Sequence, residues 1–146
     1  AVIFHDLKND RTNNFDFALE EVVQFEGETG PYVQYTHARA MSILRKANHT
    51  VDTKEAFSLT DDDAWEVLKL IENYPNVVRF AEEKCEPSAI AKFVINLAQA
   101  FNKYYAHTKV LVEDEAFNSR IALVQTTASI LKQGLALLGV AAPDEM

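Results

Sequence analysis

The segment from Pro87 to Tyr105 most strongly constrains the fold of this chain, because its apolar residues recur at helical spacing. At about 100° per residue they fall within one arc, whereas polar residues such as Lys92 and Asn96 occupy the other side. The apolar set is Ile90, Phe93, Val94, Leu97, Phe101 and Tyr104. A helix with this pattern is stable only when its apolar arc packs against other elements. We therefore expect a helix from Pro87 that packs into a core.

Proline, glycine and capping residues mark the ends of the other expected helices. Pro31 has the backbone angle favoured at the first position of a helix, and Thr60 has the side chain of an N-cap. Pro75 is expected to end the helix that precedes it, and Gly139 is expected to cap the last helix. The further expected helices run from Phe15 or Asp16 to Phe25 and over 31–47, 60–74, 75–84 and 113–138.

These segments predict an all-α antiparallel helical bundle. Only Val2–Phe4 suggests a short strand. Residues 8–14 are polar and turn-prone, so we expect residues 1–15 to be a linker or remnant of a preceding domain and residues 16–146 to form the helical domain. The chain begins at Ala1 without an initiator methionine, and we interpret it as the carboxyl-terminal piece of a larger protein.

Composition places the chain among ordinary globular proteins, with 48% hydrophobic and 25% charged residues. No apolar run approaches the ~20 residues that a membrane-spanning helix needs. The single Cys85 cannot form an internal disulfide, and no group of cysteine and histidine residues has zinc-site spacing. We therefore predict a cytoplasmic protein with no membrane partner and no metal site.

The distribution of charge indicates a local surface for RNA. The formal net charge is −8, yet residues 31–51 and 87–112 contain no acidic residue. Each of these segments carries three lysine or arginine residues together with tyrosines. Cationic, aromatic segments within an acidic chain favour RNA binding at one face. The alternative is that the lysines segregate by chance and merely solvate their helices.

Within the first of these segments, Tyr35 and Arg39 lie one helical turn apart and opposite Val33 and Leu44. A tyrosine ring can stack on an unpaired base while the guanidinium group bonds to a base edge or a phosphate. The alternative is an arginine that stacks on a tyrosine as ordinary surface decoration.

The run Phe25-Glu-Gly-Glu-Thr-Gly-Pro-Tyr-Val-Gln-Tyr-Thr-His-Ala-Arg39 closely resembles arginyl-tRNA synthetases. Matching segments follow in the same order: Ile90–Tyr105, Ser119–Val124, Gln133–Val140 and the terminal Ala-Pro-Asp-Glu-Met146. Together they resemble the carboxyl-terminal anticodon-binding helical domain of that family. The His-Ile-Gly-His and Lys-Met-Ser-Lys type signatures of the family's catalytic domain do not occur in this sequence.

The resemblance implies that this chain recognises the anticodon of tRNA(Arg) and works in cis with its own catalytic domain. The full enzyme would use ATP with magnesium to attach arginine to the tRNA. The chain alone is expected to have no catalytic residue and no cofactor, to be inactive, and not to bind DNA. Two alternatives are the related domain of another class I synthetase, such as the cysteine enzyme, and a helical protein–protein interaction module.

The resemblance also assigns site residues. It implies tRNA contacts at Tyr32, Tyr35, Arg39, Tyr105 and Met146, although a slippage of one residue would move the role of Tyr105 to Tyr104. It places a loop beside the anticodon, formed by Gln24, Phe25, Glu26, Gly27, Glu28 and Thr29. The alternative for this loop is a tight turn that joins two helices. The family often ends in Glu-Arg-Met, whereas Asp144-Glu145 precede Met146 here.

Three other conspicuous residues are expected to be structural. His37 projects toward the apolar side of its helix. Arg120 is expected to form an internal ion pair. Trp65 follows three aspartates, and we expect it to make a packing or interdomain contact rather than to stack on a base.

Overall fold

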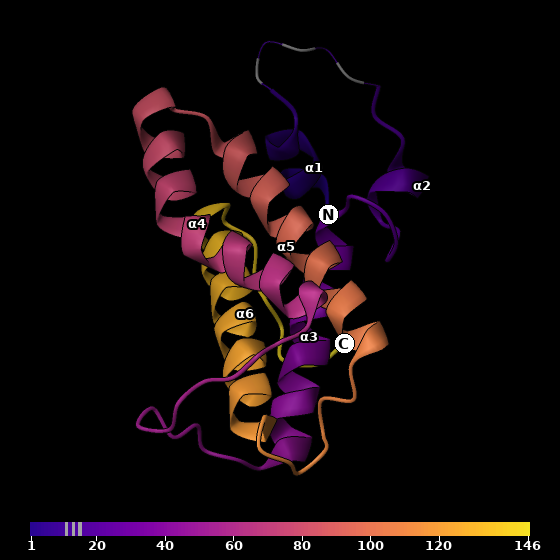
Figure 1. The fold of residues 1–146 in the computed structure, drawn as a ribbon. Coiled ribbons are helices and arrows are strands. Elements are labelled where there is room, and N and C mark those ends of the chain that lie inside the picture. The colour runs from indigo at the N-terminus through magenta and orange to yellow at the C-terminus, as the bar shows by residue number, and fades with distance from the viewer. Residues whose placement is uncertain (11, 13, 15) are drawn as a thin grey trace.

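The computed structural model describes residues 1–10, 12, 14 and 16–146. The helices of the described part are α1 (Val2–Lys8), α2 (Leu19–Val22), α3 (Gly30–Ala47), α4 (Asp62–Lys84), α5 (Pro87–His107) and α6 (Phe117–Leu137). Figure 1 shows the four long helices α3 to α6 running alternately in opposite directions, with the short α1 and α2 beside them. The predicted all-α antiparallel bundle is confirmed.

The central element of the bundle is α5, which packs against α4, α6, α1 and α3. Its predicted apolar arc is buried, and Phe101 and Tyr104 are completely inaccessible to solvent. The helix α6 approaches α5 closely at Gly134, where a Cβ atom would overlap a methyl group of Val94. The close approach of these two backbones therefore requires glycine at this position.

The helix α3 carries most of the predicted site, and it begins and ends within one residue of the prediction. At its start, the hydroxyl of Thr29 accepts a hydrogen bond from the backbone N–H of Tyr32 at 3.2 Å, and Pro31 occupies the first turn. At its end, Asn48 adopts a left-handed conformation with φ of 44°. Capping at both ends fixes the register of the side chains along α3.

The prediction that Pro75 separates two helices is wrong, because α4 continues through it. Proline removes one backbone donor from a helix, but α4 packs extensively against α5, and this packing offsets the loss. Just before the proline, the ring of Tyr74 stacks on Phe93 of α5 with centroids 5.3 Å apart. Figure 1 shows α4 changing direction along its length. The helix is also capped by Asp61 rather than by the predicted Thr60.

The structure corrects three other expectations near the ends of elements. Val2–Phe4 lies within helix α1 rather than in a strand, and Phe4 is fully buried. The helix expected up to Phe25 is reduced to the four residues of α2; its possible start at Phe15 lies outside the described residues. The last helix begins at Phe117 instead of Glu113. The proposed boundary between a linker over 1–15 and the helical domain stays a prediction.

The end of α6 has the cap that the sequence predicts. Gly139 has a φ of 70°, and the backbone N–H of Val140 donates to the carbonyl oxygen of Leu135 at 2.9 Å. This is a Schellman motif, in which a left-handed glycine reverses the chain. The remaining residues return along α3 toward the end marked C in Figure 1. Among the described helices, none has both the length and the apolar character needed to cross a membrane.

Candidate nucleic-acid interface

A surface pocket of about 430 Å³ lies between α3, the end of α5 and the carboxyl-terminal tail. Four of the predicted site residues line it: Tyr35, Arg39, Tyr105 and Met146. The other lining residues are Ala38, Ser42, Ile43, Arg45, Lys46, Leu111 and Glu145. The fold thus gathers the predicted residues from sequence positions that are far apart.

Arg39 lies at the centre of this arrangement. Its guanidinium carbon is 4.8 Å from the ring centroid of Tyr35 and 5.6 Å from that of Tyr105. Nη2 also donates a hydrogen bond to the hydroxyl of Tyr35 at 3.2 Å. Both tyrosines are 39% exposed, so their rings border the pocket and remain accessible from outside. The three side chains provide a cation and two ring surfaces for stacking.

Asn102 of α5 forms a hydrogen bond with Arg39. Asn102 was not identified as a site residue from the sequence. Its Oδ1 accepts a hydrogen bond from Nη1 of Arg39 at 2.8 Å. Its position is one turn after Ala98, which is fully buried. The sequence did contain a signal for Asn102, because it is a polar residue at the edge of the apolar arc of α5. A half-buried amide there needs hydrogen-bond partners.

Tyr32 does not line the pocket, but it belongs to the same hydrogen-bond network. Its hydroxyl accepts a hydrogen bond from Nδ2 of Asn102 at 3.0 Å. Through Asn102, the network joins Tyr32 to Arg39, two turns farther along α3. The structure therefore brings four of the five predicted residues into one pocket and connects the fifth to it indirectly.

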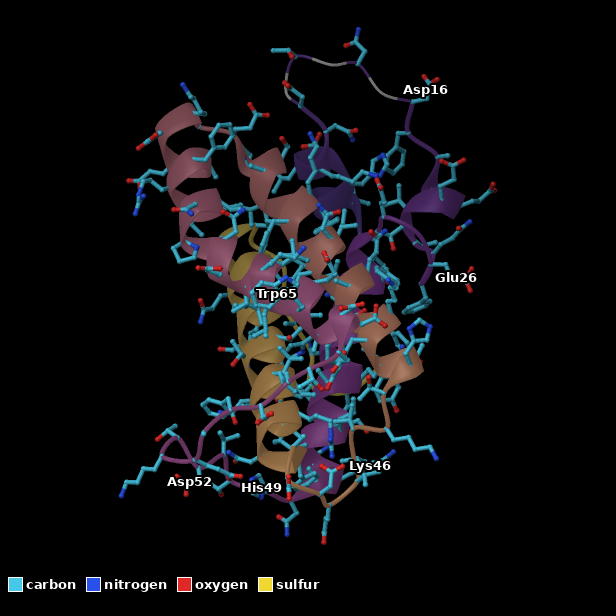
Figure 2. All side chains as sticks on the ribbon, in the orientation of Figure 1. Asp16, Glu26, Lys46, His49, Asp52 and Trp65 are labelled. Atoms are coloured by element: carbon cyan, nitrogen blue, oxygen red, sulfur yellow. The ribbon has the colours of Figure 1, made fainter. Side chains whose placement is uncertain are left out.

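The predicted loop over 24–29 lies beside the pocket. The ring of Phe25 makes an edge-on contact with that of Tyr35, with centroids 6.5 Å apart. Gly27 has a φ of 79°, a backbone angle that residues with a side chain rarely adopt. The Lys8 ammonium group donates to the carbonyl oxygen of Glu28 at 3.2 Å and ties the loop to α1. Figure 2 shows Glu26 beside the start of α3 and Lys46 near its other end.

The carboxyl-terminal tail is fastened to α3 by three side chains. Gln34 donates from Nε2 to the carbonyl oxygen of Ala141 at 2.7 Å, and His37 donates from Nδ1 to that of Pro143 at 3.0 Å. Farther along, Arg45 donates to the carbonyl oxygen of Asp144 at 3.1 Å. These bonds hold the tail at Ala141, Pro143 and Asp144, and the tail ends at Met146 in the pocket.

The two adjacent tyrosines near the end of α5 have different environments. Tyr104 is completely buried, and burial raises the pKa of its hydroxyl to about 12. Tyr105 is partly exposed and lines the pocket. Of the two, only Tyr105 lines the pocket. The assignment of the tRNA contact to Tyr105 stays a prediction.

The last turns of α5 are held against the start of α4 by charged groups. One carboxylate oxygen of Asp63 lies 2.6 Å from Nδ1 of His107 and the other lies 2.9 Å from Nζ of Lys103. These hydrogen bonds, first that of His107 and then that of Lys103, lower the pKa of Asp63. The clamp flanks Tyr105 on both sides in the sequence and restrains the helix end that carries it.

Positive charge in the pocket comes from Arg39, Arg45 and Lys46. Arg45 forms an exposed ion pair with Glu145 at 3.5 Å. In contrast, no carboxylate in the described part of the chain forms an ion pair with Arg39. Glu145 thus partly neutralises the positive charge of Arg45 at the edge of the pocket. The charge of Arg39 between the two tyrosines is not neutralised in this way.

The other three residues singled out from the sequence lie outside the pocket. His37 is 1% exposed, which agrees with its predicted structural role. Arg120 forms an ion pair, with Nη2 2.8 Å from Asp114, and lowers the pKa of that carboxyl group. The arginine is buried as predicted, but the Asp114 side chain is half exposed, so the pair is not fully internal. Trp65 is 60% exposed and borders a mainly apolar groove of about 420 Å³ between α4 and α6.

Comparison with known proteins identifies related sequences along the entire chain. Residues 33–146 match the family model described as the DALR anticodon binding domain. An arginine–tRNA ligase from Enterococcus faecalis is 65% identical over 146 residues, which is 100% of this chain and 26% of that protein. One from Lactiplantibacillus plantarum is 60% identical over the same shares.

The solved structures agree. An arginyl-tRNA synthetase from Thermus thermophilus is 35% identical, with a TM-score of 0.90, over 99% of this chain and 26% of that one. The chain therefore spans about a quarter of the length of the curated relatives that it matches. The resemblance drawn from the sequence motifs is confirmed.

Proposed function

Since the chain belongs to the DALR anticodon-binding domain family, we propose that it recognises the anticodon of tRNA(Arg) within an arginine–tRNA ligase. The observation that carries this proposal is the pocket in which Tyr35, Tyr105 and Met146 surround the charge of Arg39. Its aromatic and cationic groups are those that bind unpaired RNA bases. Recognition, rather than chemistry, is the contribution of this part of the protein.

In the proposed complex, an anticodon base leaves the stack of the loop and enters the pocket. The rings of Tyr35 and Tyr105 stack on the base or on its neighbour, while Met146 supplies an apolar contact. Arg39 bonds to acceptor atoms on the base edge or to a phosphate. A base that leaves these donors unpaired costs about 1–3 kcal/mol, which is the source of discrimination.

Tyr32 and the loop over 24–29 contribute mainly to the shape of the site. Tyr32 supports the network under Arg39, and Phe25 contacts the ring of Tyr35. Glu26 and Glu28 are exposed acids in a loop next to the proposed RNA, so we attribute its contacts to backbone N–H groups and to Phe25 rather than to charge.

The remaining part of the full-length protein would carry the reaction. The relatives are named arginine–tRNA ligases. We propose that the catalytic domain of the full-length protein, joined in cis, uses ATP with magnesium to attach arginine to tRNA(Arg). The chain described here would hold the anticodon while the distant acceptor end reaches that domain. We propose a cytoplasmic location for this activity and no role in binding DNA.

Binding to isolated stem-loops tests the proposal. The chain is titrated with the anticodon stem-loop of tRNA(Arg) and, separately, with a stem-loop that carries a different anticodon. Each titration is done at two salt concentrations. We expect tighter binding of the arginine stem-loop, weakened by salt because phosphate contacts release counterions. Arg39→Ala should lose about 1–3 kcal/mol of binding free energy and retain the melting temperature. Equal, salt-independent binding of both stem-loops would refute the proposal.

A protein–protein interaction is the second candidate, and a specific surface favours it. Phe57 is 54% exposed and Trp65 is 60% exposed, and both line the apolar groove between α4 and α6. Such exposed apolar surfaces often mark contacts with other domains or proteins. This groove is separate from the pocket at α3, so an interdomain contact at Trp65 is compatible with RNA binding elsewhere.

A further inference from the structure

We propose that Asn102 is a positioning residue that orients Arg39 for RNA while leaving its positive charge intact, an inference that rests on the proposed function. The amide of Asn102 contacts three side chains of α3 at once. Its Oδ1 accepts from Arg39 at 2.8 Å, whereas its Nδ2 donates to Thr36 at 2.8 Å and to Tyr32 at 3.0 Å. Every polar atom of the amide therefore has a partner on one neighbouring helix.

The partners determine which way the amide points. Arg39 has only donors, so it must face the oxygen of Asn102. The hydroxyl of Thr36 donates to the carbonyl oxygen of Tyr32 at 3.0 Å and is therefore free to accept from the nitrogen. Thr36 is completely buried, which gives the network a fixed anchor. A flipped amide would place two donors against each other on the side of Arg39.

Fixing Nη1 limits where the guanidinium plane can lie. With Nη1 on Asn102 and Nη2 on Tyr35, the group is held where its carbon lies 4.8 and 5.6 Å from the two tyrosine centroids. A free arginine has several rotatable bonds and would lose entropy on binding RNA. Pre-orientation removes part of that cost before the ligand arrives.

The neutrality of the amide is as important as its geometry. A carboxylate at position 102 would also accept from Arg39, but it would neutralise the guanidinium group and weaken its attraction to RNA. Within the part of the chain that the structure describes, Arg39 has no ion pair. Asparagine supplies the acceptor and preserves the charge, which explains why this residue type suits the position.

Two substitutions separate geometry from charge. Asn102→Ala removes the acceptor, and Asn102→Asp retains an acceptor but adds a negative charge. Both should weaken binding of the arginine anticodon stem-loop about tenfold, as expected for the loss of a charge-assisted contact. Asn96→Ala, an exposed asparagine on the same helix, is the matched control and should bind like the wild type. Wild-type affinity of either Asn102 variant would overturn the proposal.

A double-mutant cycle distinguishes positioning from a general structural role. If Asn102 acts through Arg39, adding Asn102→Ala to Arg39→Ala should cause no further loss of affinity. If Asn102→Ala weakens binding equally in the wild type and in Arg39→Ala, the residue acts by supporting the fold rather than through Arg39, and the proposal fails.

An experiment without RNA keeps this inference separate from the proposed function. The side-chain ¹⁵N NMR signal of Arg39 should show restricted motion in the wild type and in Asn102→Asp, and faster averaging in Asn102→Ala. Unchanged Arg39 dynamics in Asn102→Ala would refute positioning whether or not RNA binds. Conversely, restricted Arg39 in a wild type that does not discriminate between stem-loops would refute the proposed function and retain the positioning of Arg39.

Discussion

The imidazole of His37 donates a hydrogen bond to the carbonyl oxygen of Pro143, although 106 residues separate them in the sequence. The ring is 1% exposed, so the bond fastens the carboxyl-terminal tail from inside the bundle. With Gln34 and Arg45 it directs the tail along α3 toward the pocket. A histidine expected from its position to be structural thus also determines where the last residue of the chain lies.

Met146→Ala tests the role of this terminal residue. Met146 is 56% exposed, so its truncation should change the free energy of unfolding by less than about 0.5 kcal/mol. The loss of an apolar contact in the proposed site should nevertheless weaken binding of the arginine stem-loop measurably. Fluorescence anisotropy gives the affinity and thermal denaturation gives the stability. Unchanged affinity would mean that the end of the tail does not contact RNA.

Deleting residues 143–146 should affect stability as well as binding. These residues are half-buried or exposed, so the deletion removes little buried apolar surface. The structure shows that it also removes the acceptor for His37, which leaves a buried donor unpaired at a cost of about 1–3 kcal/mol. We therefore expect denaturant unfolding to show a clear loss of stability for the deletion and none for Met146→Ala.

Tyr35 should contribute to RNA binding through its ring. Tyr35→Ala should lose about 1–3 kcal/mol of binding free energy, the range for stacking of a base on an aromatic side chain. Tyr35→Phe should retain most of the affinity, because the hydroxyl only accepts a bond from Arg39, which Asn102 also holds. Equal losses in the two variants would show that the hydroxyl, not the ring, carries the interaction.

Tyr104→Phe should leave the free energy of unfolding unchanged or raise it by about 1 kcal/mol. The hydroxyl of Tyr104 is buried and has no hydrogen-bond partner among the described residues, so its removal relieves a desolvation cost. Tyr105→Phe serves as the comparison because that side chain is partly exposed. Destabilisation of Tyr104→Phe by more than about 1 kcal/mol in chemical denaturation would contradict this account.

The clamp at Asp63 should make stability depend on acid pH. Hydrogen bonds from His107 and Lys103 lower the folded-state pKa of Asp63 below the ordinary value of 3.8. Its stabilising contribution is therefore present above that value and is lost as the pH falls through the lower folded pKa.

In Asp63→Asn, the free energy of unfolding should consequently fall less steeply than in the wild type as the pH is lowered below about 4. Asp62→Asn makes the same change of charge one residue earlier and serves as the matched control for the loss of one carboxylate. Identical slopes for Asp63→Asn and the wild type, measured by urea denaturation at several pH values, would contradict the clamp.

The bundle was largely predictable because its helices carry strong local signals. The apolar arc of α5 repeats at helical spacing within one segment of the chain, and Pro31 at the start of α3 and Gly139 after α6 each act within one helical turn. The continuation of α4 through Pro75 was not predictable in this way. It depends on packing against α5, which overrides the local cost of a proline.

The candidate site shows the same division between local and long-range information. Tyr35 and Arg39 were predictable from their spacing on one helix, and Tyr105 and Met146 from the family resemblance. Asn102 was not, because its role depends on three partners on another helix. Helical spacing placed Tyr104 within the apolar arc of α5, and its complete burial agrees with that placement, whereas Tyr105 is partly exposed.

Photo-crosslinking tests the central claim most directly, because it locates the RNA on the protein. An iodinated pyrimidine is placed in turn at each anticodon position of the arginine stem-loop, irradiated in complex with the chain, and the attached peptides are identified by mass spectrometry. The account predicts crosslinks at Tyr35, Tyr105 or Met146, which are reduced in Arg39→Ala. Crosslinks confined to the groove at Phe57 and Trp65, with none at the pocket, would contradict it.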